Sequence, residues 1–181
     1  SKVKKIISIL LFVLAHNSFG QKEMTTAIGV IRFEASVPLY EEVTATNKSV
    51  SFIFIPKTGA LTIVVPMKEF RFKLSLMEEH FNEKYLESEH YPYAYFKGTI
   101  VGFNLNTIDS TPKEFKLKGE LKIHGKTKKI NTLVALQQRD TKLEIVSDFT
   151  INVKDFNIEI PEILSMKVAE TVTIGSHFLL Q

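Results

Sequence analysis

FKLKGELKI (Phe115–Ile123) decides the fold, because apolar residues and glycine alternate with charged residues along it. Side chains on a β-strand point alternately to its two faces, so this period of two predicts a strand with one buried and one solvated face. His124-Gly125-Lys126 follows as a turn, and residues 129–136 return as the partner strand. The segment therefore predicts an antiparallel hairpin.

The same alternation extends over most of the chain. It predicts eight strands, at residues 28–35, 49–55, 61–65, 93–103, 115–123, 129–136, 143–153 and 168–179. Only residues 76–88 have the period of a helix, because Met77, Phe81 and Tyr85 recur at i, i+4 and i+8. The predicted fold class is therefore all-β, an eight-stranded antiparallel barrel with one short helix inserted between strands 3 and 4.

The large apolar side chains share one face of these strands. Closing the sheet into a barrel buries that face and also removes the exposed edges. A barrel of this size can hold one slender ligand. A filled barrel or a sandwich gives the same alternation, so the pattern leaves open whether the interior is hollow.

The first twenty residues have the pattern of a secretory signal peptide. Three lysines precede an apolar run at residues 6–15, and small residues precede a predicted cleavage after Gly20. The run is about half of the ~20 residues that a bilayer core requires, which favours cleavage over a membrane span. We therefore expect a signal peptide at 1–20, a single domain at 21–181 and a periplasmic or secreted location.

Charge argues against polyanion binding by the mature chain. Removing the three signal-peptide lysines lowers Lys+Arg from 23 to 20, which equals the 20 Asp+Glu of the chain. A net charge of zero supplies no excess field to attract nucleic acid.

The predicted helix carries the candidates for metal binding and catalysis. His80, Glu83 and Glu87 share one helix face, but this spacing is common on solvated helices and no second group of ligands accompanies it. A catalytic Glu83–Glu87 pair would need surroundings that separate the two pKa values, and Ser88 and His90 are too close in sequence to converge as nucleophile and base. The chain has no cysteine, which excludes thiol nucleophiles and thiolate zinc sites. We expect solvated rim residues, no metal, no cofactor and no catalytic residue.

Four segments together resemble the YceI-like family of secreted lipocalin-like proteins. They are MEEHFNEKYLES (77–88), YPYAYFKG (91–98), GELKIHGKTK (119–128) and DFNIEIP (155–161), and the resemblance spans residues 28–178. It implies a lipocalin-like barrel around an elongated apolar cavity, in which known members hold polyisoprenoid or similar long-chain lipids. Phe96 and Gly98 match the strand after the helix, and Gly119, Leu121 and Gly125 match the central hairpin. None of these is catalytic in the family.

The resemblance implies a non-enzymatic lipid-binding protein of the cell envelope that sequesters, stores or transports a polyisoprenoid or isoprenoid-quinone-like lipid. The expected partner is such a lipid or another amphiphile, with no nucleic acid and no integral membrane segment in the mature chain, and a homodimer is left open. Two alternatives also stay open: an enzyme acting on a hydrophobic substrate at the cavity mouth, and a filled-barrel structural module without ligand. The expected cavity-lining residues are Phe33, Val50, Phe52, Phe54, Ile63, Val65, Phe70, Phe72, Met77, Phe81, Ala94, Phe96, Gly98, Ile100, Phe115, Leu117, Leu121, Ile145 and Phe149.

Overall fold

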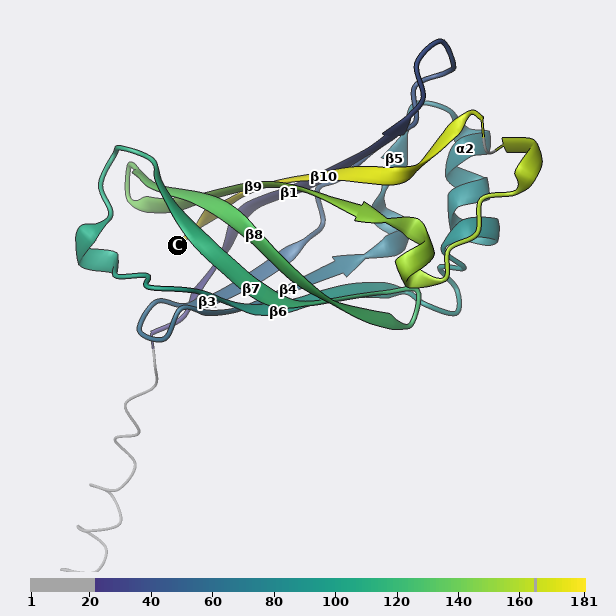
Figure 1. The fold of residues 1–181 in the computed structure, drawn as a ribbon. Coiled ribbons are helices and arrows are strands. Elements are labelled where there is room, and N and C mark those ends of the chain that lie inside the picture. The colour runs from purple at the N-terminus through teal and green to yellow at the C-terminus, as the bar shows by residue number, and fades with distance from the viewer. Residues whose placement is uncertain (1–21, 165) are drawn as a thin grey trace, which may run out of the picture.

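The chain forms a closed barrel in this computed structural model, which describes residues 22–164 and 166–181 (Figure 1). Eight antiparallel strands follow one another around the ring, and the last pairs with the first. In ring order they are β1 (Met24–Ser36), β3 (Ser51–Ile55), β4 (Ala60–Pro66), β6 (Tyr93–Ile100), β7 (Lys113–Ile123), β8 (Lys126–Arg139), β9 (Lys142–Asn152) and β10 (Val168–Leu180). The predicted barrel is confirmed.

The predicted signal peptide lies outside the described residues, because the described chain begins at residue 22. Within the described part, no helix is long and apolar enough to cross a membrane.

The hairpin that decides the fold forms as the alternation predicts. Leu117 and Leu121 on β7 are buried, whereas Lys118 and Glu120 between them are exposed. His124 and Gly125 connect β7 to β8 with φ values of 54° and 74°. Two consecutive positive φ values suit a two-residue turn whose twist matches that of the strands.

A break in one wall of the barrel was not predicted. The strand expected at residues 49–55 corresponds to β3, and an additional strand that was not expected, β2 (Thr44–Asn47), precedes it. β2 pairs with the second half of β1, whereas β3 pairs with the first two residues of β1. β2 pairs in turn with the short β5 (Arg71–Phe72). The wall therefore divides into two branches at this end of the barrel.

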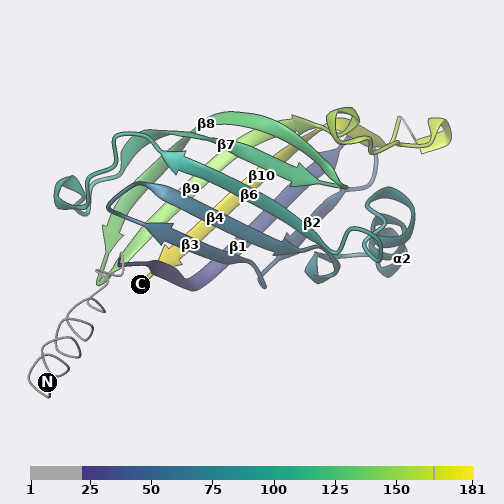
Figure 2. The same ribbon diagram turned by 90° about the horizontal axis from the view of Figure 1, so that it is seen from below.

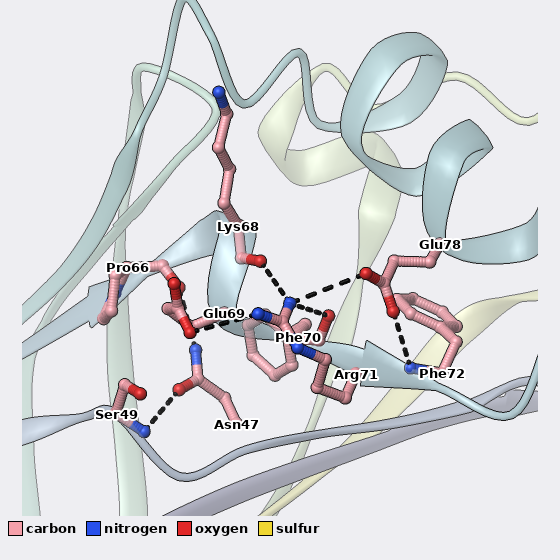
Figure 3. A network of polar contacts seen from close by, with 9 residues as sticks. All are labelled: Asn47, Ser49, Pro66, Lys68, Glu69, Phe70, Arg71, Phe72 and Glu78. Carbon is pink, nitrogen blue, oxygen red and sulfur yellow. Dashed lines mark hydrogen bonds and ion pairs between the residues drawn. The ribbon is translucent and has the colours of Figure 1, made fainter. Parts of the chain in front are cut away.

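Asn47 holds the branch point together (Figure 3). Its side chain is fully buried, its Nδ2 donates to the carbonyl oxygen of Pro66 at 2.8 Å, and its Oδ1 accepts from the backbone N–H of Ser49 at 2.8 Å. One amide side chain thus satisfies two backbone groups where the β3–β4 ladder has ended at the Ser51–Val64 pair.

The helix is shorter than predicted and changes type. α2 covers Ser75–His80 and continues as a π-helical turn, η2 (Phe81–Tyr85). Glu87 then takes a φ of 47°, which ends the helical path. Glu78 ties α2 to the sheet edge, since its carboxylate accepts from the backbone N–H of Phe72 at 3.1 Å and lies 3.5 Å from the Arg71 guanidinium (Figure 3).

Short 3₁₀ turns complete the fold. They are η1 (Met67–Glu69), η3 (Leu105–Thr107), η4 (Val153–Phe156) and η5 (Glu162–Leu164), and a window of three or four residues is too short to show a helical period. Figures 1 and 2 place α2 at one end of the barrel and the C-terminus at the other.

Two glycines let adjacent strands approach closely. Gly98 on β6 faces Gly119 on β7, and a Cβ on either would lie 2.5 or 2.4 Å from a carbonyl oxygen of the partner strand. The ring of Phe96 covers both positions, because its atoms would lie 2.8 and 2.6 Å from the same Cβ positions. The inner wall is closed here by the Phe96 ring.

Replacing Asn47 with alanine should lower the free energy of unfolding by ~1–3 kcal/mol, because the Pro66 carbonyl and the Ser49 N–H lose a buried partner. The neighbouring exposed Lys48 is the matched control, and Lys48→Ala should stay within about 0.5 kcal/mol. Urea unfolding of the three proteins measures both values. Equal stability of the two variants would show that the branch point does not depend on the amide.

Candidate functional site: an apolar cavity at one end of the barrel

The two ends of the barrel interior are filled differently. At the end away from α2, Phe52, Phe54 and Phe178 are at most 2% exposed. Their rings meet edge to face, with centroids 4.8 Å apart for Phe52–Phe178 and 6.4 Å apart for Phe52–Phe54. Leu136 and Leu180 beside them are fully buried. This packed end leaves no path through the barrel.

The other end contains a cavity of about 410 Å³ beneath α2 and η2. Its wall comes from the inward faces of β1, β4 and β6–β10, and from the helical segment above them. The lining side chains are predominantly aliphatic and aromatic. The volume lies within the range typical of small-molecule sites.

Twelve of the expected lining residues border this cavity, and seven do not. The twelve are Phe33, Ile63, Val65, Phe70, Phe72, Met77, Phe81, Ala94, Phe96, Leu117, Leu121 and Phe149. Val50, Phe52, Phe54, Gly98, Ile100, Phe115 and Ile145 are outside the lining, and apart from Gly98, which the Phe96 ring covers, they belong to the packed end. Alternation gives the face on which a side chain lies but not its depth along the barrel.

Sequence reasoning missed other lining residues. Ile31, Ile130 and Ile174 line the cavity from β1, β8 and β10, and three hydroxyl residues, Thr132, Ser147 and Ser176, line it as well. Ile31 shares a strand face with the expected Phe33, and Ser147 shares one with the expected Phe149, so continued alternation would have found these two. No inward residue was expected on β8 or β10, which contribute the other four.

Four phenylalanines, which we call the mouth cluster, attach the helical segment to the barrel. They are Phe33 on β1, Phe70 directly before β5, Phe72 on β5, and Phe81 on η2. Phe81 stacks on Phe33 with centroids 5.5 Å apart and lies 5.6 and 5.1 Å from Phe70 and Phe72. Because Phe81 is 8% exposed and also lines the cavity, its ring is both an anchor and part of the roof.

The titratable residues of the helical segment do not converge on one point. His80 borders the cavity, Glu83 is exposed, and the carboxylate of Glu87 lies 2.5 Å from Nε2 of His124. The Nδ1 atom of His124 lies 3.0 Å from the carbonyl oxygen of Phe156, so this ring joins the β7–β8 turn to η4 and to the end of the helix. Glu87 is therefore a structural partner as well as a rim residue.

Other polar groups at the cavity are few. Tyr85 also lines the cavity, and burial raises the pKa of its phenol. Glu41 and Lys167 border the cavity from connections at its open end. Among the described residues, no three His, Asp or Glu side chains gather closely enough to hold a metal ion.

Glu144 is a strongly perturbed carboxylate but lies outside the cavity. Burial raises its pKa, yet hydrogen bonds from Arg139, His177 and Gln137 outweigh burial and bring the pKa down to about 2. It lies on the outward side of β9, next to inward Ile145. A carboxylate held ionised on the outer wall cannot serve the cavity as a general acid.

Comparison with known proteins identifies one family and one fold. The YceI-like domain family matches residues 16–179. No curated protein matches the chain in sequence.

Three solved structures illustrate the shared fold. A polyisoprenoid binding domain from Saccharophagus degradans, implicated in plant cell wall breakdown, is 13% identical over 87% of this chain and 97% of its own, with a TM-score of 0.75. Burkholderia cenocepacia BcnA is 19% identical over 83% and 95%, with a TM-score of 0.68. The Campylobacter jejuni YCEI protein is 16% identical over 93% and 94%, with a TM-score of 0.60.

Replacing Phe81 with alanine should lower the free energy of unfolding by ~3–5 kcal/mol, because three ring contacts are lost and a hole opens beside the cavity. Glu83→Ala, two residues along the same turn but exposed, is the control and should change stability by less than about 0.5 kcal/mol. Chemical denaturation gives both values. A Phe81→Ala protein as stable as the wild type would mean that the mouth cluster does not hold the helical segment.

Proposed function

The chain belongs to the YceI-like domain family, and we propose that it is a non-enzymatic binding protein that holds a long-chain isoprenoid lipid in the open half of its barrel. The observation that carries this proposal is the apolar cavity of about 410 Å³ inside a barrel whose other end is packed. A folded protein closes most internal voids, so a roomy and nearly hydrocarbon-lined one is a candidate binding site.

Hydrocarbon burial is enough to supply affinity at such a site. Each buried CH₂ contributes ~0.8 kcal/mol, so a five-carbon isoprene unit contributes roughly 4 kcal/mol before the costs of association. The branched methyl groups of an isoprenoid suit a wall formed by isoleucine, valine and phenylalanine side chains. Few polar contacts are needed, in agreement with the small number of polar residues in the lining.

The Saccharophagus degradans domain supports the class of ligand, since it is described as binding polyisoprenoids and shares this fold. The pattern of residues 1–20 supports a periplasmic or secreted location. In that location, the protein would sequester, store or transport its lipid within the cell envelope.

The scattered titratable groups favour binding over catalysis. An enzyme needs a nucleophile or base within hydrogen-bond reach of a reacting group and of its own orienting partner. His80 faces the cavity, whereas Glu83 and Glu87 are directed to solvent and to His124. The described residues bring no such pair together at the cavity.

Organic extraction of the purified protein, followed by mass spectrometry, tests the proposal. We expect a long-chain isoprenoid in the extract at close to one molecule per protein. An empty extract, together with no binding of the C20 alcohol geranylgeraniol by the delipidated protein, would contradict it.

Filling the cavity should block binding and leave the fold intact. Ile174 on β10 points into the cavity and its neighbour Thr173 points to solvent, so Ile174→Trp and Thr173→Trp add the same bulk on opposite sides of one strand. We expect Ile174→Trp to weaken geranylgeraniol binding by roughly tenfold or more, equivalent to ~1.4 kcal/mol, with Thr173→Trp near the wild type.

Thermal unfolding of the same two variants separates a hollow barrel from a filled one. In a hollow barrel Ile174→Trp keeps a midpoint close to that of the wild type. If the interior were already packed, the larger ring would instead cost ~1–3 kcal/mol of stability.

A further inference from the structure

Three hydroxyl side chains, which we call the hydroxyl shelf, lie at the deep end of the apolar cavity. Thr132 on β8, Ser147 on β9 and Ser176 on β10 all line it from adjacent strands. Ser147 and Ser176 are register partners, with their Oγ atoms 2.5 Å apart. The proposed function does not require them, because a hydrocarbon is held equally well by alanine and valine.

Strand register fixes the depth of the serine pair. On β8 Val134 faces Ser147 and is buried outside the lining, so Thr132 is the deepest lining residue of that strand. One inward step toward the mouth from the serine pair is Phe149–Ile174, and both residues line the cavity. One step the other way is Ile145–Phe178, and both are buried in the packed end and absent from the lining. The serine pair therefore marks the boundary between void and packed interior.

The hydroxyl groups of the shelf do not use all of their hydrogen-bond donors and acceptors on one another. Each hydroxyl carries one donor and two acceptor lone pairs, and a Ser–Ser hydrogen bond uses one donor of the two. One serine hydrogen therefore remains available. Thr132 has no hydrogen-bond partner among the residues that the structure describes, so its hydroxyl is available too. Polar groups facing an apolar void without partners are costly, and a bound oxygen atom would remove that cost.

The charged groups of the lining lie elsewhere. Glu41 and Lys167 come from connections at the open end and His80 from α2, whereas the shelf is neutral and surrounded by hydrocarbon. Moving a phosphate or carboxylate to such a depth would be strongly unfavourable. A neutral oxygen, such as a hydroxyl or a carbonyl, fits the shelf.

From this geometry, and resting on the proposed function, we propose that the ligand is a long-chain isoprenoid with a small uncharged oxygen group at one end, and that it enters with this end first. The oxygen accepts hydrogen bonds from the shelf, and the hydrocarbon chain extends back along the cavity past the mouth cluster. A purely hydrocarbon chain leaves the spare serine hydrogen and the Thr132 hydroxyl without partners, and a diphosphate cannot reach them.

Competition against an environment-sensitive fluorescent probe tests the proposal with three C20 ligands of related skeleton: geranylgeraniol, its diphosphate, and the saturated hydrocarbon phytane. In the wild type we expect the alcohol to bind roughly tenfold more tightly than the other two. In Thr132→Val/Ser147→Ala/Ser176→Ala the alcohol should lose this advantage over phytane, while phytane binds at least as well as before. The control Thr150→Val/Thr173→Val removes two exposed hydroxyls that pair on the outer face of β9 and β10, and it should keep the wild-type preference.

Each result has a distinct meaning. Equal affinity of the wild type for alcohol and phytane, or tighter binding of the diphosphate, would overturn the shelf proposal and leave the proposed function standing. Failure of all three ligands to compete would overturn both. If the triple variant fails to fold, Ser176→Ala alone should still reduce the preference for the alcohol.

The direction in which the ligand enters the cavity can be measured separately by nuclear magnetic resonance. Nuclear Overhauser effects from the carbinol protons of bound geranylgeraniol should reach the β protons of Ser147 and Ser176. Effects to Leu76 and His80 at the mouth instead would show that the chain enters tail first and would overturn the assignment.

Discussion

Pairing of β1 with β10 is the interaction on which the rest of the structure depends. Its register runs from Thr26–Leu180 to Ser36–Val168 and turns one sheet into a ring. Once the ring is closed, the number and tilt of the strands set the width of the interior, and the size of the inward side chains decides how much of it is filled. At one end Phe52, Phe54 and Phe178 pack together and fill the interior, whereas at the other end the inward side chains leave a void. The cavity thus follows from which residue types occupy which level of the ring.

The branch in the wall explains why the open end is roofed by a helix. β2 and β3 both pair with β1, but β2 pairs on its other side with β5, whereas β3 pairs with β4. Asn47 satisfies two backbone groups where these two branches separate. β5 then offers an edge to α2 through Arg71 and Glu78 (Figure 3). Phe81 completes the attachment from inside. Polar contacts outside and aromatic contacts inside therefore hold the same short segment.

The sequence predicted the strand face on which a side chain lies much better than its depth along the barrel. Period-two alternation placed eight strands and the inward residues of all of them except β8 and β10, because side-chain direction is a local property of the backbone. It could not tell that Phe52 and Phe54 lie in the packed end while Ile63 and Phe149 line a void, since level along the axis depends on the stagger between strands distant in sequence. The break at Asn47 and the contact of Glu87 with His124 also depend on residues far apart in the chain. Ser147 and Ser176 were missed for a different reason, because only apolar residues and glycine were taken as candidates for the interior.

The packed end has a kinetic consequence under the proposed role of lipid transport. Phe52, Phe54 and Phe178 block passage through the barrel, so a molecule that enters beneath α2 must leave by the same opening. A donor and an acceptor would then compete for one surface and could not be engaged together. Transfer would follow a double-displacement scheme, in which the loaded protein leaves its first partner before meeting the second. An excess of unloaded acceptor would slow delivery by occupying the empty form.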